Sequence, residues 1–268
     1  MYKTTNDTTV EFEQCSATII EDSTFNGRRI ISIECVYPRI IHAEVLRHKD
    51  FSNSVSSSRA TPVDRIIEDC TYVPAHFYRN QRGMVGGEEL SPEESAKARD
   101  QWIYAREAAI ASARRLSEMG VHKQHVNRLL EPFSFVRHLI TATRWERFFT
   151  QRLAKDADPV IQTLAQCIHQ SMRLSVPIRR EDHYPYVLVE ERDSLPRDRL
   201  PLVSAARCAR LSYLKHDGTP STIEEDLALF ERLSMDGHWS PMEHTATSSM
   251  LTYANFDGWR SLRSRLGH

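Results

Sequence analysis

Residues 47–60 read RHKDFSNSVSSSRA and combine three consecutive basic residues with five serines and a further arginine, Arg59. Serine and asparagine often hydrogen-bond their own backbone in loops, so one interpretation is a solvated turn. The alternative is an anion site, in which arginine, hydroxyl groups and free backbone N–H groups hold a phosphate. The rest of the sequence has to distinguish these two interpretations.

The composition is that of an ordinary globular protein of 268 residues, with 40% hydrophobic and 26% charged side chains. Such a chain can bury a substantial core, and we expect a single domain over residues 1–268. The formal net charge is −1, so no overall positive field would recruit nucleic acid. Any anion site must therefore be local.

The N-terminal residues, MYKTTNDTTVEF, contain no apolar segment of the kind found in secretory signals. The chain also has no apolar run long enough for a transmembrane helix. We therefore expect a cytoplasmic protein without a membrane partner.

Cysteine and histidine spacing gives no metal or disulfide pattern. The five cysteines are odd in number and lack CxxC spacing, so we expect them to be reduced and mostly buried. The pairs His122/His125 and His238/His244 are not accompanied by a cysteine or carboxylate motif. We therefore expect no metal site.

The first part of the chain predicts strands followed by a short helix. Residues 9–21 and 28–37 are rich in β-formers around the turn sequence FNGR, which is typical of a β-hairpin. RIIHAEVLRH at 39–48 predicts a helix that delivers Arg47 and His48 at its C-terminal end. We expect the serine-rich stretch to follow as a loop.

Three helices have visible start signals. Ser91, Pro92 and Glu94 predict a capped helix that ends at Gly120. Asp158 caps a second helix over 158–172, and Ser221 with Glu224 begins a third over 221–237. Helices thus predominate over a smaller, mostly antiparallel sheet, which predicts an α+β fold.

Four separated segments share a resemblance to one enzyme family. Arg47, His48 and Lys49, with Ser57 after seven residues, are close to the signature R-H-R-x7-S. The others are HVNRLLEPFSFVRH (125–138), WERFFTQRLAKDADPVIQ (145–162), and AARCARLSY (205–213) with GHWSPMEH (237–244). Together they resemble the flavin-dependent thymidylate synthases, in which the second segment is a nucleotide-binding helix.

The order of these segments differs from that of the common family members. There the segments similar to 205–213 and 237–244 precede the signature, whereas here they come last. A circular permutation would leave this order, and permutation is tolerated when termini lie close together at the surface. We therefore divide the domain into an N-terminal hairpin (1–37), the signature loop and helical core (38–175), and a permuted segment (195–255).

The resemblance implies a reaction and its cofactors. The expected activity is methylation of dUMP at C5 to give dTMP, with FAD, NADPH and methylene-tetrahydrofolate. The cofactors would supply the difficult chemistry and the protein would supply placement and electrostatics. The resemblance also implies a homotetramer whose sites are shared between subunits.

The resemblance assigns roles to individual residues. Arg152 is the catalytic candidate, because a guanidinium against the uracil N3/carbonyl edge favours the N3-deprotonated ring and so activates C5. The other substrate-binding candidates are Glu44, Ser57, Ser58, Arg59 and Arg128. The flavin-binding candidates are Arg47, His48, Lys49, Thr141, Thr143, Arg147, Ser212, His238 and Ser240.

Several positions depart from the family pattern and leave alternatives open. Lys49 replaces an arginine, Ser54 and Val55 replace an Asn and a Glu, and Arg147 replaces an Asn. These changes favour a sibling reaction as the alternative, either methylation of UMP or hydroxymethylation that stops before hydride transfer. A non-catalytic nucleic-acid-binding module is a remote alternative, which the net charge of −1 disfavours.

Overall fold

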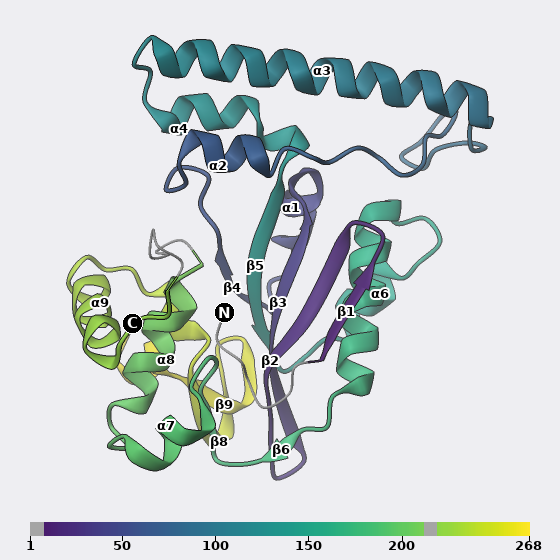
Figure 1. Cartoon of the computed structure of the whole chain (residues 1–268). Helices are drawn as coiled ribbons and strands as arrows, with labels where there is room; N and C mark the ends of the chain where they lie inside the picture. The colour runs from purple at the N-terminus through teal and green to yellow at the C-terminus, as the bar shows by residue number, and fades with distance from the viewer. Residues whose placement is uncertain (1–7, 212–218) are drawn as a thin grey trace.

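The computed structural model describes residues 8–211 and 219–268, and its centre is a mostly antiparallel sheet (Figure 1). The strand order is β1–β2–β3–β5–β4, with β6 joined to β2 as a parallel neighbour. The bounds are β1 Thr9–Phe12, β2 Cys15–Phe25, β3 Arg28–Pro38, β4 Ser52–Val55, β5 Phe135–Ala142 and β6 Ile178–Arg179.

The predicted N-terminal hairpin is confirmed as β2 and β3, which pair antiparallel over most of their length. Their connection is Asn26–Gly27, and both residues have positive φ, as a tight hairpin turn requires. The predicted first strand is divided in two, because Glu13 adopts a φ of +50° and the chain turns there between β1 and β2.

The prediction of a loop after Lys49 was wrong for residues 52–55, which form β4. Ser52 and Ser54 are buried, whereas Asn53 and Val55 are half-buried, which is the two-residue period of a strand. The strand forms because residues 52–55 pair antiparallel with β5, and Ser54 lies opposite Leu139 in that pairing. Serine-rich composition indicated a loop, and long-range pairing overrode it.

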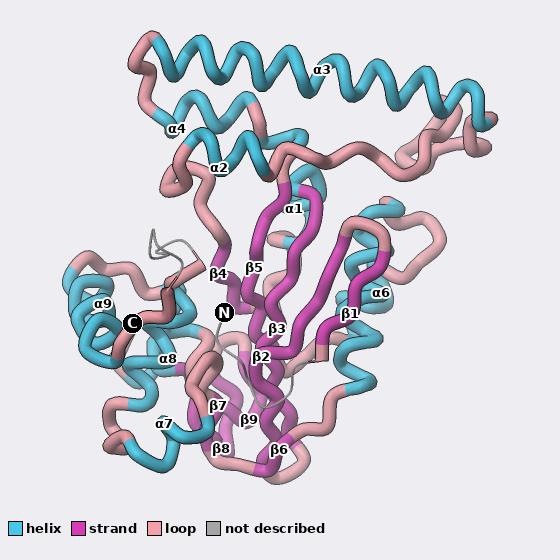
Figure 2. Tube along the Cα trace, in the orientation of Figure 1, coloured by secondary structure: helices cyan, strands magenta, loops and turns pink. Residues whose placement is uncertain are grey.

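One face of the sheet is covered by α5 (Glu146–Arg152) and α6 (Pro159–Leu174), and Figure 2 shows α6 alongside the strands. The predicted cap of α6 is confirmed, since Asp158 accepts hydrogen bonds from the N–H groups of Val160 and Ile161. Strand alternation separates the two faces: Ile140 lies in the core beneath α6, and its neighbour Leu139 lies in a cluster on the other face.

The other face is covered by the C-terminal part of the chain. The elements are β7 Asp182–His183, α7 Val189–Ser194, α8 Leu200–Ala209, α9 Ile223–Met235, β8 Ala246–Tyr253, β9 Phe256–Ser261 and α10 Leu262–Arg265. Strands β7, β8 and β9 form a second sheet. Arg207 of α8 is fully buried and joins this layer, because its guanidinium pairs with Glu191 of α7 and Asp226 of α9.

The third predicted helix begins one residue later than expected. Thr222 is the N-cap of α9 and forms the capping box with Glu225, in place of Ser221 and Glu224. Ser221 instead donates its hydroxyl hydrogen to Asp226 at 2.6 Å. Because Asp226 is the buried partner of Arg207, Ser221 is part of that ion-pair network.

A third group of helices lies beyond the end of the main sheet. It comprises α2 Val63–Glu68, α3 Pro92–Glu118 and α4 Lys123–Val126, whereas the turn Arg39–Ile41 and α1 His42–Val45 pack Ile41 and Val45 into the core of the main sheet. The capping box of Ser91 and Glu94 at the start of α3 is confirmed, and Gly120 ends the segment with a φ of +78°. Figure 1 shows that α3 runs across the top of the molecule above α2 and α4.

The resemblance implied a helix around Arg128 and Pro132, and the structure has no continuous helix over residues 125–138. The segment consists of the end of α4, two single turns at Asn127–Leu129 and Glu131–Phe133, and the first part of β5. Pro132 lies within the second turn, where its fixed φ suits a 3₁₀ conformation but cannot continue a long helix.

The antiparallel sheet and surrounding helices thus give the predicted α+β class. All five cysteines are buried and free, as expected. Within residues 8–211 and 219–268, no helix combines the length and the apolar composition needed to cross a membrane.

Four buried histidines and the half-buried His42 make the fold sensitive to acid. Burial lowers the pKa of His42 and His48 to about 4 and that of His244 to about 3. Burial also holds the pKa values of His138 and His183 well below the ordinary range. All five side chains are therefore neutral in the folded protein at neutral pH, whereas the unfolded chain would protonate them near pH 6.5.

We predict that the free energy of unfolding falls as the pH is lowered from about 6.5 to about 4. In this window the unfolded state binds more protons, and each fully depressed histidine contributes a slope of about 1.4 kcal/mol per pH unit. Three groups act in the opposite direction: burial raises the pKa of Glu21 and of Asp69, and the hydrogen bond to Glu89 raises the pKa of His76, but these are three groups against five. Urea denaturation at pH 7, 6 and 5 measures the effect. An unfolding free energy that stays constant or rises on acidification would contradict this assignment.

Candidate functional site

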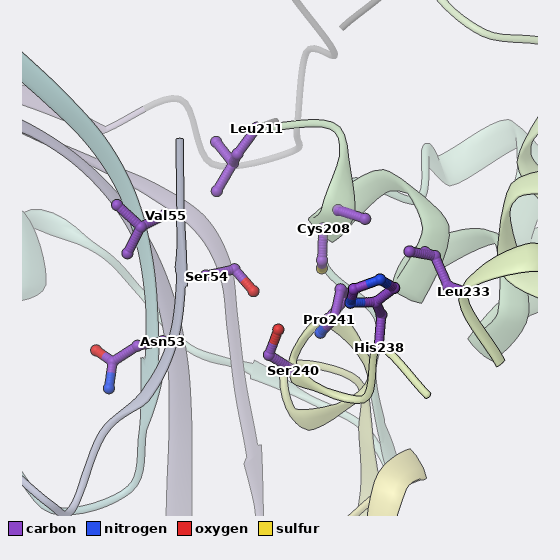
Figure 3. A pocket seen from close by; sticks show the side chains of 10 residues that line it. Asn53, Ser54, Val55, Cys208, Leu211, Leu233, His238, Ser240 and Pro241 are labelled. Atoms are coloured by element: carbon purple, nitrogen blue, oxygen red, sulfur yellow. The ribbon is translucent and has the colours of Figure 1, made fainter. Parts of the chain in front are cut away.

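The signature strand and the C-terminal segments line one hollow of about 130 Å³ (Figure 3). Strand β4 contributes Asn53, Ser54 and Val55 to one wall. The opposite wall is formed by residues of α8 and its C-terminal end, of α9, and of the turn that follows α9: Cys208, Ala209, Leu211, Leu233, His238, Ser240 and Pro241. Two of the sequence segments, separated by about 150 residues of chain, therefore meet within one subunit.

Ser54 is the unusual member of this wall. Its side chain is buried and, among the described residues, its hydroxyl has no hydrogen-bond partner. A buried hydroxyl without a partner costs about 1–3 kcal/mol of desolvation, so it indicates a site where a ligand or water completes the bonding. Figure 3 shows the hydroxyls of Ser54 and Ser240 pointing towards one another across the opening, with His238 beside them.

Asn53 is held by a chain of hydrogen bonds that crosses the sheet. His138 of β5 approaches the Asn53 Oδ1 atom with its Nε2 at 2.9 Å and the hydroxyl of Tyr37 with its Nδ1 at 2.7 Å. The same hydroxyl lies 2.9 Å from Nδ1 of His42. Since an amide oxygen only accepts, His138 carries its proton on Nε2, and Tyr37 then donates to Nδ1. The Asn53 amide group in turn donates to the carbonyl of Phe51, which fixes its orientation.

Arg152, the last residue of α5, lies at the centre of a second cluster with Glu44 and His48, which precede β4 in the chain. Its Nε donates to Nε2 of His48 at 2.9 Å, and its two terminal nitrogens donate to the Glu44 carboxylate at 2.9 Å and the Glu44 carbonyl at 3.3 Å. The arginine side chain is only 14% exposed. Of its five N–H groups, three are committed in this way, which leaves two for a ligand within the described part of the chain.

His48 accepts a hydrogen bond from Arg152 and must therefore be neutral at that nitrogen. Burial first, and then the positive charges of Arg152, Arg147 and Arg47, lower its pKa to about 4. The ring packs edge-on against Phe148, with ring centroids 4.9 Å apart. Arg47, Lys49 and Arg147 are all exposed, so the surface beside this cluster is cationic.

The expected phosphate cradle contains a carboxylate that the sequence analysis did not anticipate. Ser58 donates its hydroxyl hydrogen to Glu131 at 2.8 Å, and Arg128 lies 3.7 Å from the same carboxylate. Asn127 donates to the carbonyls of Ser58 and Thr61, which anchors the loop. The Glu131 carboxylate thus accepts the hydrogen bond of the Ser58 hydroxyl, which a bound phosphate would need. An incoming phosphate would have to displace this carboxylate.

The remaining predicted residues lie in different surroundings. Arg59 is exposed at the end of the serine stretch. Glu44 forms an ion pair with Arg152, away from the cluster of Ser58, Arg128 and Glu131. Thr141 is fully buried, and its hydroxyl is committed to Ser32 and His244.

The last two candidates for flavin binding are Thr143 and Ser212. The hydroxyl of Thr143 accepts a hydrogen bond from the backbone N–H of Asp257. Ser212 lies outside the described residues.

Asn53, Cys208 and Glu131 are neighbours of the site that were not predicted from the sequence. The sequence SNSV at 52–55 does not alternate apolar and polar residues, so the two faces of the strand and the place of Asn53 appear only in the structure. No local pattern marked Glu131, since its role depends on the approach of Ser58 from a distant part of the chain.

Strand β4 connects the three parts of the site. Glu44 and His48, which hold Arg152, precede it in the chain, the hollow lies along it, and Ser58, which contacts Glu131, follows it. The arrangement offers cations, hydroxyls and an amide to a polar, anionic ligand. Among residues 8–211 and 219–268, no three His, Cys, Asp or Glu side chains lie close enough together to hold a metal ion.

Comparison with known proteins gives similarity in fold. No family model matches the sequence. No curated protein matches it either. A crystal structure of the UMP/dUMP methylase PolB from Streptomyces cacaoi, bound with 5-Br UMP, matches with a TM-score of 0.52 and 12% identity. The match covers 61% of this chain and 90% of that chain.

A structure of the same methylase bound with 5-Br dUMP matches with a TM-score of 0.44 and 14% identity, over 55% of this chain and 66% of the other. The protein therefore shares the fold of the structure bound with 5-Br UMP over more than half of its length.

We predict that Ser54→Ala leaves the ligand-free protein equally stable or stabilises it by up to about 1 kcal/mol, because the substitution removes a buried hydroxyl without a partner. Ser32→Ala is the matched control: Ser32 is also buried in the sheet, but its hydroxyl contacts Thr141 and His183. Its loss should cost about 1–3 kcal/mol. Urea denaturation compares the two variants, and an equal loss of stability in both would show that the Ser54 hydroxyl has a partner in solution.

Proposed function

We propose that the protein is a flavin-dependent enzyme that methylates a uridine nucleotide, dUMP or UMP, at C5. The observation that carries the proposal is the meeting of the signature strand β4 with the C-terminal segments at one hollow, beside the Arg152 cluster. The fold similarity to a methylase of UMP and dUMP supports a pyrimidine nucleotide as the substrate.

Arg152 would contact the pyrimidine. Its guanidinium is held by Glu44 and His48, so its two remaining N–H groups have a fixed direction. A fixed cation at the N3/carbonyl edge stabilises the ring as N3 loses its proton, and the electron density at C5 rises. Because His48 is neutral, it orients Arg152 without competing for the developing negative charge.

The nucleotide phosphate would bind at the serine loop. Ser57, Ser58, Arg59 and Arg128 supply hydroxyls and cations there, and Glu131 would release Ser58 as the phosphate enters. Arg128 is 62% exposed and its pairing with Glu131 spans 3.7 Å, so it is a weak surface pair that a phosphate can replace.

The donor set at β4 suits FAD, although the hollow is small. Ser54 has an unpartnered hydroxyl and lies with Ser240 and His238, while Arg47 and Lys49 present cations at the surface nearby. When bound, the flavin would supply the hydride, drawn from NADPH, that completes the methyl group delivered by methylene-tetrahydrofolate.

The size of the hollow supports a shared site. A volume of about 130 Å³ is below the roughly 300–1,000 Å³ of typical cofactor pockets. We therefore propose that a homotetramer completes the flavin site with residues of neighbouring subunits. We also propose that the segment order arose by circular permutation. The support is that the C-terminal segments lie against β4 although they follow it in the chain.

The decisive test is product analysis with purified protein. We expect the protein to be yellow after incubation with FAD and desalting, and to be tetrameric by light scattering. With NADPH and methylene-tetrahydrofolate, mass analysis should find a product heavier by one CH₂ unit from dUMP or UMP, and none from dCMP. Product from UMP alone would assign the sibling reaction, and addition of CH₂O would identify hydroxymethylation. Protein that stays colourless and forms no product would contradict the proposal.

We predict that Arg152→Ala lowers nucleotide affinity by about ten- to a hundredfold, because a charge-assisted hydrogen bond in a shielded site contributes roughly 1.5–3 kcal/mol. Arg152→Lys should restore affinity only in part, since lysine keeps the charge but lacks the planar fork.

Titration with the nucleotide measures both variants, and flavin content with circular dichroism checks that they are folded. The exposed Arg173 on α6 provides the control substitution Arg173→Ala. Equal nucleotide affinity in the Arg152→Ala and Arg173→Ala variants would remove Arg152 from the site.

A further inference from the structure

A second hollow, of about 240 Å³, lies at the opposite edge of the main sheet. The first hollow lies along β4, whereas the second adjoins the turn between β1 and β2. Its walls come from that turn, from the segment 72–78, from α3 and from the start of α6. None of the residues assigned above to nucleotide or flavin lines it, so it is independent of the proposed function.

The walls of this second hollow are largely aromatic and aliphatic. Tyr72 and Trp102 meet almost at right angles, with ring centroids 5.9 Å apart and an interplanar angle of 87°. The corner is fixed, because the indole N–H of Trp102 donates to the Tyr72 carbonyl at 3.1 Å. Tyr78 and aliphatic side chains such as Ile40 and Val160 complete the walls. Ring faces in this arrangement attract cations through their negative quadrupole.

The charged groups that line the second hollow are mainly negative. Glu13 and Asp158 contribute carboxylates, and no lysine or arginine is found among the described lining residues. His76 also lines the hollow, but its ring lies between the carboxylates of Glu13 and Glu89, at 3.7 and 2.7 Å. Arg99 reaches one wall only through a hydrogen bond to the carbonyl of Ala75.

Three neighbouring groups respond to this negative potential. Burial raises the pKa of Tyr72, and the carboxylates of Asp158 and Glu13 raise it further. Burial likewise raises the pKa of the Cys15 thiol, with additional contributions from Cys167, Glu13 and Asp158. Burial also raises the pKa of Tyr78, and the carboxylates of Glu89, Glu13 and Asp158 raise it further. Burial opposes any charge there, but the contribution of the carboxylates, which opposes ionisation of the phenols and the thiol, also attracts a cation.

We propose that this second hollow binds a small organic cation, an alkylated ammonium ion whose charge lies against Tyr72 and Trp102 and near Glu13. The aliphatic walls suit the apolar substituents of such an ion. The carboxamide oxygen of Gln14, which has no hydrogen-bond partner in the described part of the chain, supplies a further acceptor in the wall. A bare metal ion would lack ligands on the apolar walls, and an anion would be repelled by the carboxylates.

The test compares choline with its neutral isostere 3,3-dimethyl-1-butanol, using the full-length protein at constant ionic strength. Isothermal titration and saturation transfer to the choline methyl protons measure binding. We expect choline to bind with a dissociation constant in the millimolar range or below, and the neutral isostere at least about tenfold more weakly. Equal binding of the two compounds, or no binding of choline, would overturn the proposal.

Two variants locate the site. Trp102→Leu removes the ring and should weaken choline binding about five- to thirtyfold. Glu13→Gln preserves shape and should weaken it several-fold, whereas Glu11→Gln, an exposed carboxylate on β1 that does not line the hollow, should have no effect. Because Trp102 also anchors α3, the Glu13 variant keeps the test valid if Trp102→Leu fails to fold. Choline affinity that is equal in the Glu13→Gln and Glu11→Gln proteins would place binding elsewhere and overturn the assignment.

Discussion

The pairing of β5 with both β3 and β4 is the constraint on which the site depends. It places the signature residues at the edge of a sheet instead of in a free loop. It also aligns the polar side chains of β5 with their partners, so that His138 reaches Asn53 on one strand and Tyr37 on another. Tyr37 and His138 are buried, and a buried polar chain stabilises only one arrangement because every member must be satisfied. Asn53 is therefore held in one orientation beside the hollow.

The sequence predicted the features that depend on neighbouring residues. The capping box of Ser91 and Glu94, the cap at Asp158 and the turn at Asn26–Gly27 each involve residues within a few positions, and all three are present. The cap at Ser221 was predicted one residue too early because Thr222 offers the same chemistry, and the buried Asp226 recruits Ser221. Local signals thus identified the element but not the long-range contact that adjusted its boundary.

Features that depend on distant residues were not predictable in this way. Strand β4 exists because β5 lies beside it, and the hollow exists because α8 and the turn after α9 return to that strand. The resemblance in short motifs placed Arg152 and His48 in one site, and they are hydrogen-bonded to one another. It could not place Glu131 beside Ser58, since that contact joins residues 73 positions apart. Composition likewise gave no indication that Ser54 would be buried without a partner.

The central claim is that β4 and the C-terminal segments bind one ligand within the same subunit. Amide hydrogen exchange followed by mass spectrometry, with and without FAD and dUMP, tests this directly, because bound ligand slows local opening of the backbone that it contacts. The account predicts that peptides covering 52–58, 205–211 and 237–241 become protected together. Protection confined to one of these segments, or exchange that the ligands leave unchanged, would contradict it.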